Sequence, residues 1–400
     1  MGMRARTPSS ALRAVHRCVR ICGVMALATP TIVRGQVPER SAARQIKVTG
    51  RFTALKLTPV LTLTDAVLDT RHVSALAVSA AGDLVIADGA ERLLVFTPSG
   101  AKVRAIGRAG GGPGEFKGPL SLGWLHDTLV VLDHNQRRVS LFSLHTGTLL
   151  TSFPWVIKGR PEGLLNGGSS LLAVVESRTG KSHPVFNGTG TMLPLAEFGI
   201  APVTAAGIGR PIAQLRDSVD RQTGSDCEAS KGRIATFEAF FPDHGSMRAL
   251  TPTAQLISAN RDTFLLTIRQ AERSTPMAVI IGPALRWPVT NAIWDSVAAE
   301  YRAAEKTAGI GRCVPPIVRP ATLPAIRALS TDEVGVIWVE VADRAGTAMN
   351  ALRPDGNALG AFHLPVRDET VPWVVRKLRL YVVLTDADGL QSVQVYRIGQ

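Results

Sequence analysis

Short apolar segments recur along this chain, and turn-forming residues separate them. Each segment is strand-length and too short for a helix. Over the first two intervals and the last one, the segments start about 45 residues apart, which is close to the length of one four-stranded repeat. The six segments are Leu84–Ala87, Leu129–Leu132, Leu171–Val175, Phe264–Leu266, Val336–Val339 and Tyr381–Leu384.

A strand that is apolar at every position has both faces buried, whereas an alternating strand keeps one face in water. Turns flank the segments, as at residues 81–83 and 98–100, and indicate successive hairpins. Four-stranded sheets that stack face to face around an axis bury their strands on both sides. We therefore predict an all-β fold, a six-bladed β-propeller, over residues 36–400. A seven-bladed ring is the alternative, because the interval from Leu171 to Phe264 is long enough to hold one more blade.

Two stretches depart from this rhythm. Residues 199–247 carry no long apolar segment, and we predict an irregular insertion there. Residues 291–308 are predicted to form one inserted helix, capped by Asn291 and ended by Gly309, which packs on the propeller as a lid or plug. Its apolar positions follow helical spacing at Ile293, Val297, Tyr301 and Ala304.

Closing a ring of blades requires a strand beside the last one. Residues 52–63 alternate loosely between apolar and polar positions and precede the first repeat. We predict that they pair with the strand at residues 393–398 and so close the propeller.

The first 35 residues have the pattern of a secretory signal peptide. An arginine-rich start leads into the uncharged segment Ile21–Val33, which as a helix of about 20 Å is too short to cross a hydrocarbon core of about 30 Å. We expect cleavage at the Ala26–Ala28 motif or near Gly35, no transmembrane segment, and export to the periplasm or the extracellular space. An organelle transit peptide is the alternative.

Charge argues against a nucleic-acid partner. The formal net charge of +13 falls to about +7 without the arginines of residues 1–35, and the remaining basic residues lack interleaved aromatic side chains. The densest basic groups, Arg137–Arg138 and the stretch from Arg376 to Arg379, are interpreted as solvated surface charge.

Two cysteines, Cys227 and Cys313, remain after removal of the signal peptide. In an oxidising compartment they are candidates for one disulfide, whose long loop gives about 4–5 kcal/mol in the chain-entropy model. Two unrelated buried thiols are the alternative, and the sequence leaves both open.

The segment Gly107–Pro119 places a glycine-rich turn, an aromatic residue and a proline ahead of the second repeat. In Val131–Phe142, which follows, Asp133, Asn135 and Arg138 surround a turn before a strand that ends in phenylalanine. These two segments resemble the inter-blade junction and the next hairpin of NHL-repeat and related TolB-like six-bladed propellers. The resemblance implies that the Asp, Asn and Arg side chains brace the turn. It is strong over the first two repeats, and the later repeats share only the apolar segment and the period.

Few side chains form a chemical motif. Asp88 and Asp133 are candidates for metal or acid groups, but each begins a turn and is followed by an arginine, Arg92 or Arg138, which favours a structural Asx-type turn. The histidines show no zinc-binding spacing, and no nucleophile elbow or phosphate-binding loop is present.

Glu176 and Glu340 each come directly after an apolar segment and are candidates to face the axial channel. Propellers bind ligands at the axis, where the loops of all blades converge. We predict an exported, monomeric binding or protein-interaction module, rather than an enzyme, with a protein, peptide or small-molecule partner of unassigned kind. The alternative is an axial-metal-dependent hydrolase, lactonase or lyase of the six-bladed propeller type. The resemblance implies calcium or zinc as a cofactor only under that alternative.

Overall fold

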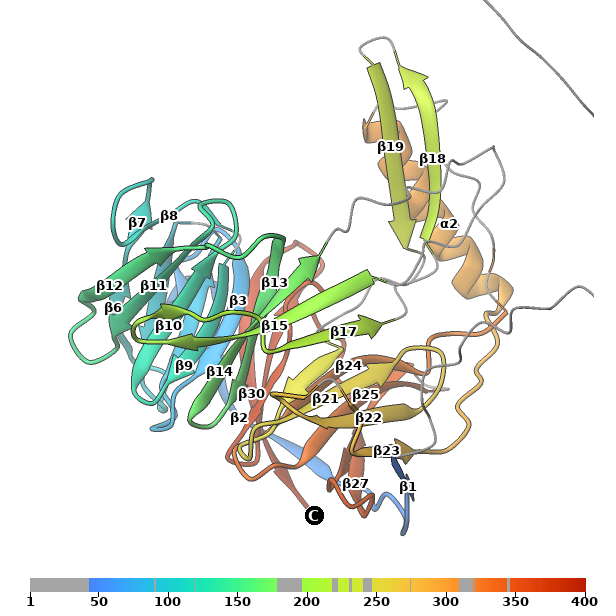
Figure 1. Ribbon diagram of the computed structural model, residues 1–400. Coiled ribbons are helices and arrows are strands. Elements are labelled where there is room, and N and C mark those ends of the chain that lie inside the picture. The colour runs from blue at the N-terminus through green and yellow to red at the C-terminus, as the bar shows by residue number, and fades with distance from the viewer. Residues whose placement is uncertain are drawn as a thin grey trace, which may run out of the picture. The chain divides into compact units, whose positions relative to one another are not determined.

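Strands dominate the structure of the protein, a computed structural model (Figure 1). Among the residues that the structure describes, two helices accompany them, α1 (Asp65–Leu68) and α2 (Asn291–Ala308), and neither is long and apolar enough to span a membrane. The structure describes residues 43–89, 91–118, 120–177, 196–217, 222–229, 232–239, 247–273, 275–308, 319, 321–343 and 346–400.

Three of the six large sheets are four-stranded antiparallel meanders, and we number them as blades 1, 2 and 5. Their strands follow one another along the chain from the inner to the outer edge. Blade 1 contains β3 (Val73–Val78), β4 (Leu84–Asp88), β5 (Arg92–Phe96) and β6 (Lys102–Ile106). Blade 2 contains β9 (Leu120–Leu125), β10 (Thr128–Asp133), β11 (Arg138–Ser143) and β12 (Leu149–Pro154). Blade 5 contains β24 (Ile326–Thr331), β25 (Ile337–Asp343), β26 (Gly346–Leu352) and β27 (Ala358–His363).

Blades 3, 4 and 6 vary at the outer edge. Blade 3 has an outer strand in two pieces and contains β13 (Arg160–Gly167), β14 (Ser170–Ser177), β15 (Ala196–Thr204), β16 (Gly207–Ile208) and β17 (Ala213–Asp217). Blade 4 contains β20 (Arg248–Leu250), β21 (Gln255–Asn260), β22 (Leu265–Gln270), β23 (Ala278–Ile281) and β1 (Arg44–Lys47). Blade 6 contains β28 (Val374–Arg376), β29 (Arg379–Thr385), β30 (Gln391–Gly399) and β2 (Lys56–Leu63). Two small sheets pair β7 (Arg108–Ala109) with β8 (Glu115–Phe116) and β18 (Gln222–Ala229) with β19 (Gly232–Ala239).

Apolar contacts join the blades in a closed ring. Each of six apolar clusters draws side chains from two blades, and the pairs run from blades 1 and 2 round to blades 6 and 1. The innermost strands contact one another in the same order, β3, β9, β13, β20, β24 and β28, and β28 contacts β3 again. The prediction of a six-bladed β-propeller is confirmed, and the seven-bladed alternative is wrong.

Strand β4 shows why the apolar segments are continuous. All of its residues are buried, and successive side chains enter different clusters. Leu84 and Ile86 pack against blade 6, whereas Val85 and Ala87 pack against blade 2. A second strand with a blade on each side therefore needs apolar residues at every position.

One of the six predicted segments has a different place from the other five. In blades 1, 2, 3, 5 and 6 the segment lies in the second strand, but Phe264–Leu266 leads into β22, the third strand of blade 4. The second strand of that blade is β21, where only Leu256, Ile257 and Ser258 are buried. Its polar ends made it less conspicuous in the sequence than its neighbour.

The predicted insertion at residues 199–247 is too long. Strands β15 and β17 extend through residue 217 and form the outer half of blade 3, so the insertion begins after them and includes the β18–β19 hairpin. The inserted helix is confirmed as α2, but Asn291 is its first residue and not its cap. The Thr290 hydroxyl instead accepts a hydrogen bond from the main-chain N–H of Ile293 (3.3 Å). Tyr301 and Ala304 lie outside the described side chains.

The amino-terminal segment runs along the outer edges of three blades. β1 pairs in parallel with β23 of blade 4, and residues 49–55 bond to the edge of β27 in blade 5. β2 then pairs antiparallel with β30, from Lys56 opposite Gly399 to Leu63 opposite Val393. The predicted closure of the ring by residues 52–63 is confirmed for residues 56–63, whereas residues 52–55 lie against blade 5. The additional pairing of β1 was not foreseen.

Two expectations fall on residues that the structure does not place. The signal peptide, residues 1–35, lies outside the described residues. Cys227 belongs to β18 without a described side chain, and Cys313 lies outside the described residues, so the disulfide remains a prediction.

The turn between β28 and β29 carries backbone strain. Lys377 and Leu378 have φ of 49° and 52°, at two positions where Gly, Asn or Asp are usual. We expect Leu378→Gly to raise the free energy of unfolding by about 1 kcal/mol, because a left-handed conformation costs a side chain about that much. Urea denaturation measures the change. Leu390→Gly, at another exposed leucine but with ordinary φ, should lower stability, and equal effects at the two sites would contradict the strain.

Candidate functional site

The two ends of the propeller are distinguished by the direction in which the innermost strands run. Four antiparallel strands return the chain to the end at which it entered the blade, so every innermost strand begins at the same end. We call this end the N face and the opposite end the C face. The first residues of the innermost strands, at the N face, are Val73, Leu120, Arg160, Arg248, Ile326 and Val374.

The three longest connections between blade strands all belong to the N face. They are residues 178–195 within blade 3, 218–247 between blades 3 and 4, and 282–325 between blades 4 and 5. At the C face the longest connection is residues 271–277. Insertions in a repeat architecture often build its binding face, and the N face is therefore the candidate functional surface.

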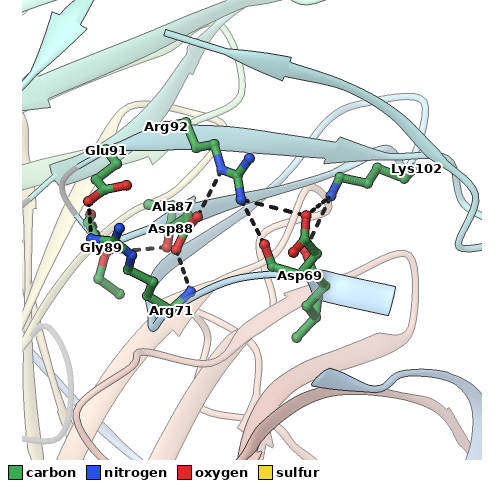
Figure 2. A network of polar contacts seen from close by, with 10 residues as sticks. Asp69, Arg71, Ala87, Asp88, Gly89, Glu91, Arg92 and Lys102 are labelled. Carbon is green, nitrogen blue, oxygen red and sulfur yellow. Dashed lines mark hydrogen bonds and ion pairs between the residues drawn. The ribbon is translucent and has the colours of Figure 1, made fainter. Parts of the chain in front are cut away.

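A network of charged side chains fixes the connection between blades 6 and 1 at the N face (Figure 2). Asp88, 2% exposed at the end of β4, accepts hydrogen bonds from the main-chain N–H of Arg71 (2.9 Å) and from Nε of Arg92 (2.9 Å). Arg92 also donates to the carbonyl of Asp69 (2.7 Å), which follows α1. Lys102 Nζ lies 3.5 Å from the Asp69 carboxylate. The buried carboxylate thus holds the chain that enters β3.

Blade 2 repeats this arrangement. Asp133, 2% exposed, accepts hydrogen bonds from the main-chain N–H groups of Lys117 (2.7 Å) and Gln136 (2.8 Å). Arg138 donates to main-chain carbonyls of the glycine-rich junction at 2.6–3.1 Å, and Asn135 donates to the carbonyl of Lys117 (3.1 Å). The bond from Gln136 confirms the predicted Asx-type turn at Asp133, whereas the Asp88 carboxylate binds Arg92 and the connection into β3.

A cavity of about 500 Å³ opens beside this network in blade 1. Its lining residues are Asp65, Ala66, Asp69, Thr70, Arg71, Asp88, Glu91 and Arg92. Arg71 Nη1 lies 2.6 Å from Glu91 Oε1, and Arg92 pairs with Asp88, so opposite charges are already matched. In the described part of the chain, no group of three or more His, Cys, Asp and Glu could hold a metal ion. The cavity is best explained as part of the blade junction.

Three innermost strands carry a β-bulge next to the N face. The pairing register shifts around Ser74 in β3, Glu162 in β13 and Arg327 in β24. A bulge re-aims the extra side chain, and bulges are frequent beside functional sites. The sequence analysis missed these residues, because a bulge depends on the register with the neighbouring strand and leaves no local pattern.

Glu162 forms a carboxyl pair with Glu176 of β14. Burial raises the pKa of Glu162, and the adjacent Glu176 charge and a hydrogen bond between the two side chains raise it further. Arg160 and Arg248 oppose this rise. Like charges this close disfavour ionisation, which is why the neighbouring carboxylate adds to the rise in the pKa of Glu162. Glu176, one of the two glutamates that the sequence singled out, therefore belongs to a polar cluster at the N face.

A histidine connects blades 2 and 3 near this pair. His134 Nδ1 lies 3.1 Å from the Pro161 carbonyl oxygen, and Nε2 lies 2.8 Å from the hydroxyl of Ser121. Because a carbonyl only accepts, Nδ1 carries the proton and Nε2 accepts from Ser121. Burial lowers the pKa of His134, which keeps the imidazole neutral at pH 7.

Glu340, the other candidate to face the axial channel, lies at a seam between two blades instead. It is fully buried, and its Oε2 accepts hydrogen bonds from Arg367 Nη2 (2.8 Å) and Trp373 Nε1 (2.6 Å) at the seam between blades 5 and 6. Arg327 Nη2 lies 3.2 Å from Glu369 at the same seam, and burial lowers the pKa of Arg327. Glu340 lies among buried apolar residues of β25. This is the second strand of blade 5 and has a neighbouring blade on each side.

Comparisons with known proteins identify no family for this chain. No family model matches the chain, and no curated protein matches it. Among solved structures, a Bacteroides fragilis NCTC 9343 protein named as a candidate for export is 11% identical, with 90% of this chain and 100% of that chain covered and a TM-score of 0.45. A chain of a mitotic checkpoint complex is 13% identical, with 95% and 99% covered and a TM-score of 0.44. Neither likeness bears on the residues of the N face.

Proposed function

We propose that this protein is an exported binding or protein-interaction module whose partner docks on the N face over blades 3 to 5. One observation carries the proposal: the three longest connections between blade strands start and end at the N face. They are residues 178–195, 218–247 and 282–325. A closed ring requires none of these segments, since blades 1 and 2 are complete without any of them. Their concentration on one face indicates a contact surface.

The polar cluster at the same face favours a protein or peptide partner. Glu162, Glu176, Arg160 and Arg248 bring charges of both signs to the N-face ends of blades 3 and 4. The Arg248 guanidinium lies 3.7 Å from the centre of the Phe198 ring, which combines a charge with an apolar surface. Arginine and aromatic side chains beside unlike charges are typical of protein interfaces.

The finer assignment to the NHL or TolB-like type is part of this proposal. It is supported by the sequence resemblance of residues 107–119 and 131–142 and by the bond that Asp133 accepts from the main-chain N–H of Gln136 within the turn. Asn135 and Arg138 instead bind main-chain carbonyls of the glycine-rich junction. Export is supported by the pattern of residues 1–35, and the mature propeller would then comprise residues 36–400.

Photo-crosslinking from single sites tests where the partner docks. A photoreactive amino acid replaces Lys158 or Arg160 at the N face, and in a second set Arg353 at the C face; all three residues are exposed. After irradiation of cells that naturally produce the protein, we expect one crosslinked species of defined mass from the N-face positions, at least tenfold stronger than from Arg353. The readout is an immunoblot followed by mass spectrometry.

The probe at Arg353 on the C face is the control for the two probes on the N face. Equal crosslinking from both faces indicates random collisions, and crosslinking from Arg353 alone places the partner on the C face. Either result contradicts the proposal. A crosslink to a second copy of this chain from the N face would identify self-association and also contradict a separate partner.

A further inference from the structure

Three arginines form a row across blade 6 at its C-face end. Arg376 of β28 lies directly opposite Arg379 of β29, which lies directly opposite Arg397 of β30. Residues opposite one another in an antiparallel pair have Cβ atoms about 5 Å apart and side chains on the same side of the sheet. Thr58 of β2 continues the line on the far side of Arg397. We call the three basic residues the arginine row.

The arginine row lies at the seam between blades 6 and 1. The same side of the sheet, two positions from the row on each strand, carries Val374, Tyr381 and Val395. These three side chains pack in the apolar cluster between blades 6 and 1. The row therefore marks the place where this cluster ends and solvent begins. One of its members, Arg397, is exposed, and the other two are half-buried.

No described residue forms an ion pair with the arginine row. Nε of Arg376 is buried without a hydrogen-bond partner, and Arg379 lies within hydrogen-bonding reach of the Tyr381 hydroxyl. Lys377, at the adjoining turn, adds an exposed cation. The nearby Glu333 carboxylate accepts from the main-chain N–H of Lys377 (2.9 Å) and offsets only part of this charge.

Other arginines at blade seams are held differently. Arg92 pairs with the buried Asp88, and Arg367 pairs with the buried Glu340. Arg138 is held by main-chain carbonyls. Like charges directly opposite one another destabilise a sheet, so the arginine row lowers the stability of the chain unless an anion neutralises it.

We propose that the arginine row binds an oxyanion, a phosphate or sulfate group, at the C face. Guanidinium groups present paired N–H donors that match the oxygens of such a group, and charge-assisted hydrogen bonds of this kind are among the strongest in proteins. Three arginines whose Cβ atoms lie about 5 Å apart along the row concentrate three positive charges, which suits a ligand with more than one charged group. The source is either a soluble phosphorylated or sulfated compound or the headgroups of an anionic lipid. This site is separate from the N face and does not depend on the proposed function.

Thermal unfolding with added anions tests the soluble source. Sodium pyrophosphate, phosphate and sulfate are added to the purified protein at constant ionic strength, which sodium chloride maintains. We expect pyrophosphate to raise the unfolding midpoint of the unmodified chain. In Arg379→Gln, which removes the centre of the row, calorimetric binding of pyrophosphate should be at least about tenfold weaker, because one charged hydrogen bond accounts for such a factor.

A matched control separates the row from general surface charge. Arg353→Gln removes the same charge from an exposed arginine at another C-face turn, and it should leave the anion response unchanged. Without anions, Arg379→Gln should unfold at the same or a higher temperature than the unmodified chain, since repulsion is relieved. A purely structural arginine would give a lower temperature. If Arg379→Gln fails to fold, the exposed Arg397→Gln serves in its place.

Vesicle sedimentation distinguishes the lipid source. Vesicles of phosphatidylcholine are compared with vesicles of phosphatidylcholine and phosphatidylglycerol in equal parts. Binding to the anionic vesicles alone, lost in Arg379→Gln, assigns the row to lipid headgroups; a response to free anions without vesicle binding assigns it to a soluble ligand. The proposal is overturned if neither anions nor anionic vesicles bind, or if Arg379→Gln and Arg353→Gln respond alike.

Discussion

Removal of residues 43–63 is expected to abolish cooperative folding of the propeller, because the ring can then no longer close. Leu63 is 2% exposed in the cluster between blades 6 and 1, and Leu61 and Leu57 pack on the two sides of blade 6. Full burial of a leucine such as Leu63 stabilises by about 1.5–3 kcal/mol, and the pairing of seven residues of β2 with β30 adds main-chain hydrogen bonds. The loss is on the order of 5–10 kcal/mol, which is comparable with the whole stability of an ordinary domain. Circular dichroism during heating measures it.

The matched control restores β2 by attaching it to the other end of the chain. β30 ends with Gly399 opposite Lys56, so a chain that lacks residues 43–63 can carry a glycine and then residues 56–63 after Gln400. Gln400 and the glycine would form a two-residue hairpin turn, and β2 would meet β30 in its native register. We expect this rearranged chain to regain most of the cooperative transition. A truncated chain that melts like the intact one would show that β2 does not close the ring.

The features of the fold that the sequence predicted well are those fixed by burial on both sides of a strand. Leu84 to Ala87 are apolar at each position because blades 6 and 2 lie against opposite faces of β4. In blade 4 the rule identifies the wrong strand, because β21 begins and ends with the polar Gln255 and Asn260 and the segment at Phe264, which leads into β22, gives the stronger signal. Apolar patterning thus locates a blade more securely than it identifies the strand within it.

Side chains whose partners are local were also predictable. Asp133 and the N–H of Gln136 that it binds are three residues apart, so the turn is visible in the sequence. The pair of Glu162 with Glu176 depends on a bulge, and Arg367 reaches Glu340 from the connection between two blades. Such contacts follow from register and ring closure, which a single sequence does not display.

The arginine row illustrates the same limit. Arg376 and Arg379 are visible as a basic stretch, which we interpreted as solvated charge, but Arg397 joins them only through the pairing of β29 with β30. Three separate positions thereby become one concentrated charge. A basic stretch in a β-rich sequence is therefore worth examining against the next strand of the hairpin before it is assigned to the surface.

The Glu340–Arg367 pair is where a single substitution should cost most. Their side chains are 1% and 3% exposed and 2.8 Å apart, and Trp373 Nε1 donates to the same carboxylate oxygen. Glu340→Ala leaves a buried guanidinium without its partner, which typically costs about 3–5 kcal/mol. We expect a loss of that size in urea denaturation, and a smaller loss in Glu340→Gln, whose amide oxygen can still accept from Trp373.

A double substitution separates the loss of a partner from the loss of the pair. Replacing both charges, as in Glu340→Leu with Arg367→Met, removes the unpaired charge that each single substitution leaves, so the double variant should be more stable than Glu340→Ala. Recovery should be incomplete, because Arg367 Nη1 also donates to the carbonyls of Asp368 (3.1 Å) and Val371 (3.3 Å) and thereby shapes the connection into blade 6. A loss below about 1 kcal/mol in Glu340→Ala, the range of an exposed pair, would mean that water reaches this seam and that the two blades separate there in solution.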